Sequence, residues 1–202
     1  MVDAVVALER AYDQTAKLVA DMGAEQLDAP SPCAGWDVRA TLNHLLGATW
    51  MFSLVNEGHD GGVGGAAADA IGDDARLAVA AAAARNLASW RQPDALEGDR
   101  TYPFGTFPAP FGLMLNLQEV VVHNWDIATA TGAELAVDDD IARCVYAWAV
   151  AIPLDEFRSH GAFGPEVSVD AGASTLDRLI GLFGRQPRDA ARHGGCAEPR
   201  HA

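Results

Sequence analysis

The sequence predicts a single all-α domain, built as an up-down four-helix bundle with short extra helices. Four long segments carry apolar residues at helical spacing. Each of these segments is delimited by capping residues or glycines, and strand-like character is confined to one short stretch. With 202 residues, 50% of them hydrophobic and 21% charged, the chain can bury one core. We expect residues 1–190 to form this domain and the polar residues 191–202 to form a frayed tail.

The first two helices are expected on either side of a proline-containing loop. In residues 3–22 apolar side chains recur every three or four positions, Asp3 can cap the start, and Gly23 can end the helix. The loop that follows closes on the segment Cys-Ala-Gly-Trp at 33–36. A second helix is then expected over roughly 37–54, with leucines on its apolar side.

The rest of the chain is expected to be helical with one exception. An alanine-rich third helix is expected over 73–92. In 94–110 aromatic residues are interrupted by Pro and Gly, which indicates an irregular loop or a short hairpin. A fourth helix is expected over roughly 111–131 and a fifth from Asp138, while Ser174 can cap a short last helix.

Charge and composition argue against several classes of partner. A net charge of -14 repels phosphate backbones and anionic membranes, so we expect neither nucleic acid nor membrane as a partner. The longest apolar stretch, residues 77–84, is too short to span a bilayer, and the N-terminus lacks the apolar run of a signal peptide. Three cysteines without CxxC spacing favour neither a disulfide framework nor a cysteine-based zinc site. We therefore expect a cytoplasmic protein.

The fourth helix carries the residues with the most chemistry. Because successive residues turn by about 100°, His123 lies about 40° and Asp126 about 20° from Glu119 around the helix axis. Most of the remaining circumference is apolar, so this stripe is expected to be buried. An unpaired buried carboxylate costs several kcal/mol, and these side chains therefore need partners.

A divalent metal ion is one partner that satisfies both side chains. Glu119 and His123, one helical turn apart, present a carboxylate and an imidazole to the same point, which is a common geometry for Zn²⁺, Ni²⁺ or Fe²⁺. His44, on the apolar second helix, is the natural third ligand. Asp126 would act in catalysis by orienting a metal ligand or by facing the substrate.

Other interpretations of the same residues are open at this point. Glu119 and His123 could form a buried ion pair in a metal-free bundle, or a metal could be purely structural in a non-catalytic binding or stress-response module. Cys33 could be a nucleophile near a helix N-terminus, although a small buried cysteine in a tight loop is the simpler interpretation. Trp36 fits a packing role better than a substrate platform.

Three stretches of the chain resemble a known family. They read PSPCAGWDVRATLNHLLG, EVVVHNWDIATATG and STLDRLIGLFGRQP. The first two resemble signatures of the DinB-like bundle superfamily, in the branch of the N-terminal domain of mycothiol-dependent maleylpyruvate isomerase. The third is similar to the end of a stand-alone, single-domain subgroup found mainly in actinobacteria. The resemblance extends over about residues 5–190.

The resemblance implies a fold, a metal and a thiol. The family's metal ligands fall on His44, Glu119 and His123, and its metal, usually zinc, activates the thiol of mycothiol. We accordingly expect a mycothiol-dependent S-transferase or isomerase acting on a small electrophilic substrate. Apart from the resemblance, we expect Trp36 and Trp125 to shape the cofactor surroundings, and helical bundles with exposed faces can pair as homodimers. The family's isomerase has a further C-terminal domain in its active site, for which this chain has no room, so maleylpyruvate isomerisation itself is not implied.

Overall fold

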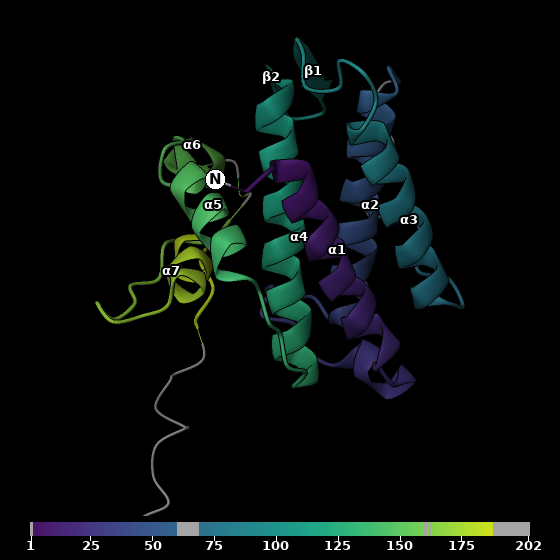
Figure 1. Cartoon of the computed structure of the whole chain (residues 1–202). Helices are drawn as coiled ribbons and strands as arrows, with labels where there is room; N and C mark the ends of the chain where they lie inside the picture. The colour runs from purple at the N-terminus through teal and green to yellow at the C-terminus, as the bar shows by residue number, and fades with distance from the viewer. Residues whose placement is uncertain (1, 60–68, 160, 162, 188–202) are drawn as a thin grey trace, which may run out of the picture.

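The structure, a computed structural model, describes residues 2–59, 69–159, 161 and 163–187 (Figure 1). The predicted tail over 191–202 lies outside these residues. The helices and strands have the following bounds: α1 Ala4–Ala20, a 3-10 helix Ala24–Asp28, α2 Val38–Asn56, α3 Ala75–Trp90, β1 Asp99–Tyr102, β2 Gly105–Pro108, α4 Ala109–Thr131, α5 Asp139–Ala149, α6 Leu154–Ser159 and α7 Thr175–Leu182. The predicted all-α bundle is confirmed.

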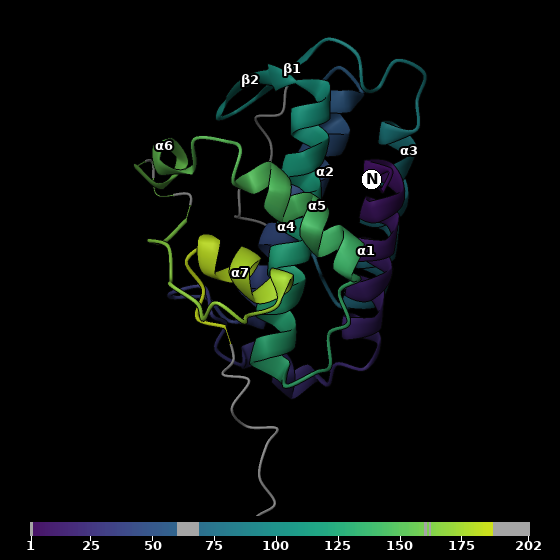
Figure 2. The same ribbon diagram turned by 60° about the vertical axis from the view of Figure 1, so that its left-hand side comes forward.

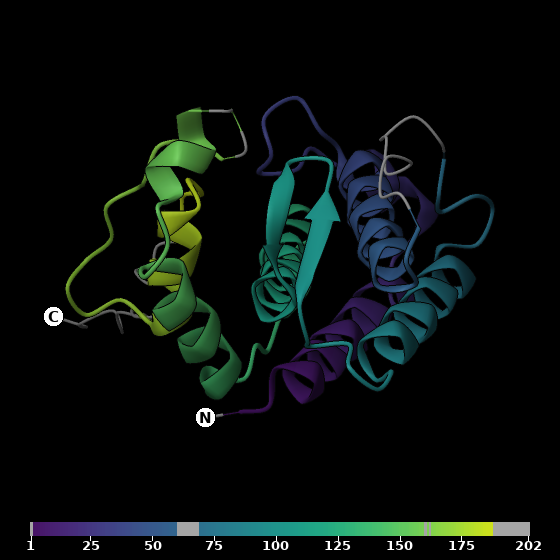
Figure 3. The same cartoon turned by 90° about the horizontal axis from the view of Figure 1, so that it is seen from above.

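Helix α4 is the central element of the molecule. It packs against α1 and α2 within the four-helix bundle, while α3 closes the bundle by packing against the same two helices. On its other side α4 contacts α5, and α5 in turn packs against α7 (Figures 1 and 2). Seen from above, α4 lies between the other bundle helices and the unit formed by α5, α6 and α7 (Figure 3). Residues on α4 therefore face two different layers.

The bundle helices run in the order down, up, up, down. Near the ends of α2 and α3, Asn56 Nδ2 donates to Ser89 Oγ at 3.1 Å, so these two helices are parallel and finish together. At the opposite end Arg39, in the first turn of α2, pairs with Asp69 just before α3, at 3.2 Å. Helix α3 thus begins at the end of the bundle where α2 begins. Phe52, near the end of α2, packs on Tyr102, which contacts Gly112 in the first turn of α4, so α2 and α4 are antiparallel (Figure 1).

The helix boundaries follow from local capping chemistry. Asp3, Asp37, Asp74 and Ser174 each accept backbone N–H hydrogen bonds at the first turn of α1, α2, α3 and α7. Helix α4 ends at Gly132, whose φ of 73° suits a residue without Cβ. The short hairpin expected within 94–110 is confirmed as the antiparallel pair β1–β2.

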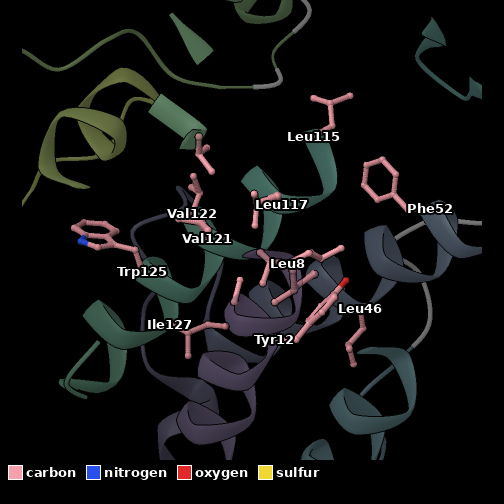
Figure 4. Packing of buried hydrophobic residues seen from close by; sticks show 14 of the residues in the cluster. Leu8, Tyr12, Leu46, Phe52, Leu115, Leu117, Val121, Val122, Trp125 and Ile127 are labelled. Carbon is pink, nitrogen blue, oxygen red and sulfur yellow. The ribbon is translucent and has the colours of Figure 1, made fainter. Parts of the chain in front are cut away.

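The core lies inside the bundle and continues between α4 and α5 (Figure 4). A polar network crosses it, in which Tyr12 Oη donates to Asn86 Oδ1 at 3.0 Å and accepts from Asn116 Nδ2 at 3.3 Å. Trp90 Nε1 also donates to Asn116, at 2.9 Å. Asn116 therefore faces the bundle interior, where α1, α3 and α4 meet. None of the helices in the described part of the chain has the length and apolar character needed to cross a membrane.

A left-handed glycine fixes the exit of the chain from α7. Gly184 has a φ of 79°, and a Cβ at this position would lie 2.9 Å from the backbone of Gly164. We expect Gly184→Ala to lower the free energy of unfolding by at least about 1 kcal/mol, because alanine is strained at positive φ. Urea unfolding would measure the loss. Gly172→Ala is the control, since no atom lies within 4 Å of a Cβ there; equal effects of the two changes would contradict the prediction.

Candidate metal centre

Three candidate ligands meet between the antiparallel helices α2 and α4. His44 lies on α2, while Glu119 and His123 lie one turn apart on α4. The Nε2 atoms of both histidines approach one oxygen, Glu119 Oε2, at 3.2 Å from His44 and 3.3 Å from His123. The two imidazole centroids are 4.9 Å apart. The structure thus brings together the three residues that the sequence predicts as ligands.

The spacing of these atoms suits a shared metal ion. Metal–ligand bonds of about 2.0–2.2 Å place tetrahedral ligands roughly 3.3–3.6 Å apart. The observed 3.2 and 3.3 Å are close to this spacing. They are longer than charge-assisted hydrogen bonds, which measure about 2.7–2.9 Å. All three ligand atoms lie within 4.8 Å of one another. Two imidazoles and one carboxylate are also the donors of some catalytic zinc sites.

Access to the cluster is from the side of His44. The exposed fraction of the side chain falls from 36% at His44 through 21% at Glu119 to 7% at His123. His44 is therefore the most exposed member of the cluster, and His123 is the member most enclosed by protein. An arrangement of three protein ligands with one accessible side matches catalytic zinc sites better than structural ones, which have four protein ligands.

The two tryptophans predicted to shape the site lie in different places. The Trp36 indole, from the loop before α2, lies 4.9 Å from the ring of His44 and 6.2 Å from that of His123, with the latter pair stacked. Trp36 is thus beside both imidazoles. Trp125 is buried in the hydrophobic core with 7% of its surface exposed (Figure 4). A role for either in binding a cofactor stays a prediction.

Asp126 lies directly behind His123 and is completely buried. As a carboxylate it accepts a hydrogen bond from His123 Nδ1, at 2.9 Å. The same Oδ2 atom accepts from Arg185 Nη2 at 2.9 Å and from Cys33 Sγ at 3.2 Å. Asp126 can therefore act on a metal through the orientation of His123, and its catalytic role stays a prediction.

The charges in the cluster support one another. Burial opposes ionisation of Glu119, but hydrogen bonds from His123 and His44 outweigh it and hold the pKa of this carboxyl well below its usual range. Burial also opposes protonation of His123, yet its hydrogen bonds to Asp126, Cys33 and Glu119 raise its pKa well above the ordinary value. The pKa of Asp126 is lowered despite burial, by His123 and Arg185. In the metal-free protein the positive charge of the protonated His123 imidazole thus compensates the two carboxylates. A metal cation bound in place of the proton on Nε2 could supply this positive charge instead.

Two residues of this environment are not among the predicted site residues, although Cys33 is considered above as a nucleophile. Cys33 is a half-buried cysteine in a tight loop, as expected, but it also contacts Asp126. Arg185 reaches the same carboxylate from beyond α7. A single sequence carries little signal for Arg185, because an arginine after a short C-terminal helix usually faces solvent.

A second group of ligand-type atoms is less suited to a cation. Cys33, His123 and Asp126 also lie within 4.8 Å of one another. However, the guanidinium of Arg185 lies 2.9 Å from Asp126 and 3.1 Å from the sulfur of Cys33. A fixed positive charge at these distances repels a metal ion. The better candidate for a metal is therefore the group of His44, Glu119 and His123.

The fold and this cluster define the class of the protein: a helical bundle with a candidate two-histidine, one-carboxylate metal centre between two of its helices. The model of the mycothiol maleylpyruvate isomerase N-terminal domain family matches residues 8–128, more than half of the chain. The chain belongs to this family, which confirms the resemblance found in its sequence. The three candidate ligands all lie within the matched residues.

Two relatives and one solved structure are similar to this chain. Two uncharacterized proteins of Mycobacterium tuberculosis, from strains CDC 1551 / Oshkosh and ATCC 25618 / H37Rv, are each 31% identical over 192 residues, which is 92% of this chain and 100% of theirs. The crystal structure of the mycothiol-dependent maleylpyruvate isomerase superposes with a TM-score of 0.57 at 17% identity. The superposed region covers 72% of this chain and 68% of the isomerase chain. At this identity the superposition shows a shared fold.

Proposed function

We propose that this chain holds one divalent metal ion, zinc in the first place, at His44, Glu119 and His123, and uses it in thiol-dependent transferase or isomerase chemistry. The observation that carries the proposal is the convergence of three candidate ligand atoms within 4.8 Å of one another, with the side chain of His44 partly exposed. Membership of a mycothiol maleylpyruvate isomerase family supports mycothiol as the thiol. The substrate would be a small electrophile.

The chain's own residues would bind and orient the reactants. His44 lies at the accessible edge, where a thiol would enter, and the Trp36 indole covers the imidazole rings from one side. Asp126 holds His123 through Nδ1, so that Nε2 points at Glu119. A metal at such a centre supplies Lewis acidity that lowers the pKa of a thiol. The resulting sulfur nucleophile suits S-transfer or reversible addition to a conjugated acid.

The thiol chemistry can be tested apart from turnover. We expect mycothiol added to the Co²⁺-loaded protein to produce sulfur-to-metal charge-transfer absorption in the near ultraviolet, because a thiol entering the open side would contribute its sulfur. S-methyl mycothiol, which has no thiol to deprotonate, is the matched control. Turnover would then be screened with mycothiol and small electrophiles, including cis-configured conjugated acids. Metal-loaded protein with neither absorption change nor turnover would indicate a structural metal in a non-catalytic module.

A further inference from the structure

A buried arginine from the C-terminal unit reaches the back of the candidate metal centre. Arg185 follows α7 and lies outside the residues that match the family model. Its Nε donates to Asp126 Oδ1 at 3.2 Å and its Nη2 to Asp126 Oδ2 at 2.9 Å. The side chain of Arg185 is 10% exposed and that of Asp126 is 0% exposed. The guanidinium therefore makes a hydrogen bond to each carboxylate oxygen in a site that is largely shielded from water.

The main chain around Arg185 is fixed as firmly as its side chain. The backbone N–H of Arg185 donates to Ile180 O at 3.1 Å, and Nη1 donates to Phe183 O at 2.9 Å. Phe183 is 1% exposed and packs edge-to-face on Phe163. The left-handed Gly184 sets the direction in which the arginine leaves α7. Hydrogen bonds and packing thus hold both the backbone and the side chain of Arg185 in place relative to α7.

Stability alone is a weak explanation for this ion pair. Removing two charges from water costs several kcal/mol for each ion, and mutual attraction repays this only when the geometry is good. Burial of the pair directly behind a candidate metal ligand points to positioning. Asp126 Oδ2 accepts hydrogen bonds from His123, Arg185 and Cys33, and Arg185 also donates to Oδ1, so its two contacts fix the plane of the carboxylate that faces the imidazole.

The orientation of the His123 ring determines whether its Nε2 can coordinate a metal ion together with His44 and Glu119. A histidine ligand usually donates its second ring N–H to a carboxylate, which fixes both the tautomer and the ring plane. His123 has this arrangement, with Nδ1 on Asp126 at 2.9 Å and Nε2 towards Glu119 at 3.3 Å. Without the guanidinium, Asp126 Oδ1 would lose the hydrogen bond from Arg185 Nε and Oδ2 would keep only those from His123 and Cys33, so the direction of the imidazole would be less firmly fixed.

We propose that Arg185 is a positioning residue, which holds Asp126 in place so that His123 presents Nε2 to the metal. Through this arginine, the α5–α7 unit sets the metal affinity of the centre. The inference rests on the proposed metal centre at His44, Glu119 and His123. It assigns a role in that centre to the part of the chain beyond the family match.

Zinc affinity measured by competition with a chromophoric chelator tests the clamp. We expect Arg185→Met, which keeps much of the side-chain volume, to bind zinc about 10- to 100-fold more weakly than wild type, as is usual when the partner of a histidine ligand is disturbed. Arg185→Lys keeps the positive charge but cannot contact both carboxylate oxygens as a guanidinium does, so its zinc affinity should lie between those of Arg185→Met and wild type. Arg178→Met is the matched control, because the exposed Arg178 on α7 donates to Ala171 O in the same unit.

A second readout separates positioning from a general loss of structure. In the zinc-loaded protein the Nδ1–H proton of His123 should be protected from exchange and visible by NMR in wild type and in Arg178→Met, and should broaden or vanish in Arg185→Met. Amide exchange of α7 reports whether the unit stays docked. Unchanged zinc affinity and an unchanged His123 signal in Arg185→Met would overturn the inference, as would a loss shared by Arg178→Met.

The two proposals fail in different ways. Wild-type protein that binds zinc, and loses it on His44→Ala, supports the metal centre whatever Arg185→Met does. Zinc binding that survives His44→Ala overturns the centre, and with it the clamp. Undocking of α7 in Arg185→Met with retained zinc affinity overturns the clamp alone.

Discussion

Replacing His123 by alanine is expected to abolish stoichiometric metal binding. His123 is the most buried of the three candidate ligands, and it connects Glu119 on one side with Asp126 on the other. Its removal takes away one of three ligands and the anchor of a second, because Glu119 Oε2 loses its partner on the same helix. Elemental analysis of untagged protein should find about one Zn, Ni or Fe per wild-type chain and none in the variant.

The controls for this result come from the same chain. His44→Ala removes a ligand from the other helix and should abolish binding as well. His59 is exposed and lies three residues beyond α2, outside the cluster, so His59→Ala should keep its metal. Metal retained in full by either ligand variant would defeat the assignment. Absence of metal in wild type even after reconstitution would leave Glu119 and His123 as a structural pair.

Replacing Asn86 by alanine is expected to cost the largest share of stability outside the site. Asn86 is 0% exposed. Its amide donates to Thr49 O and Ser53 Oγ at 3.1 and 3.2 Å and accepts from Tyr12 Oη at 3.0 Å. Leaving such groups unpaired costs about 1–3 kcal/mol, and the vacated volume adds to the loss, so we expect about 2–4 kcal/mol in total.

Thermal and urea unfolding would measure this change. In a chain of this size 1 kcal/mol corresponds to about 2–4 °C, so Tm should fall by roughly 4–16 °C. Gln92→Ala, which removes an exposed amide just after α3, should change stability by less than about 0.5 kcal/mol. A loss below about 1 kcal/mol in Asn86→Ala would mean that water satisfies the broken hydrogen bonds.

Helix positions could be predicted from the sequence, but the directions of the helices could not. Capping residues such as Asp3 and Ser174 act locally, so the predicted starts of α1 and α7 agree with the structure. The parallel course of α2 and α3 depends on contacts across the bundle, such as that between Asn56 and Ser89. Periodicity says which face of a helix is buried, and it gives no information on which end of a neighbour that face meets.

The proximity of the candidate ligands Glu119 and His123 was predictable because helix geometry places them on one stripe of α4. Helix geometry also places Asn116, three residues before Glu119, about 60° from it around the axis, whereas in the structure its amide contacts Trp90 and Tyr12. A central helix has several neighbours, and an angle around its axis does not say which of them a polar side chain meets. Arg185 could not be found in this way, because its contact with Asp126 joins segments 59 residues apart.

The distance along the chain between Asp126 and Arg185 has a consequence for biosynthesis. At about 5–20 residues per second, the ribosome adds the 59 residues from Asp126 to Arg185 in roughly 3–12 s. Every candidate metal ligand is therefore made several seconds before the arginine that holds Asp126 in place. If the nascent bundle folds in that interval, it offers a looser ligand set than the finished chain, and a wrong metal captured then can still exchange before the last helix docks.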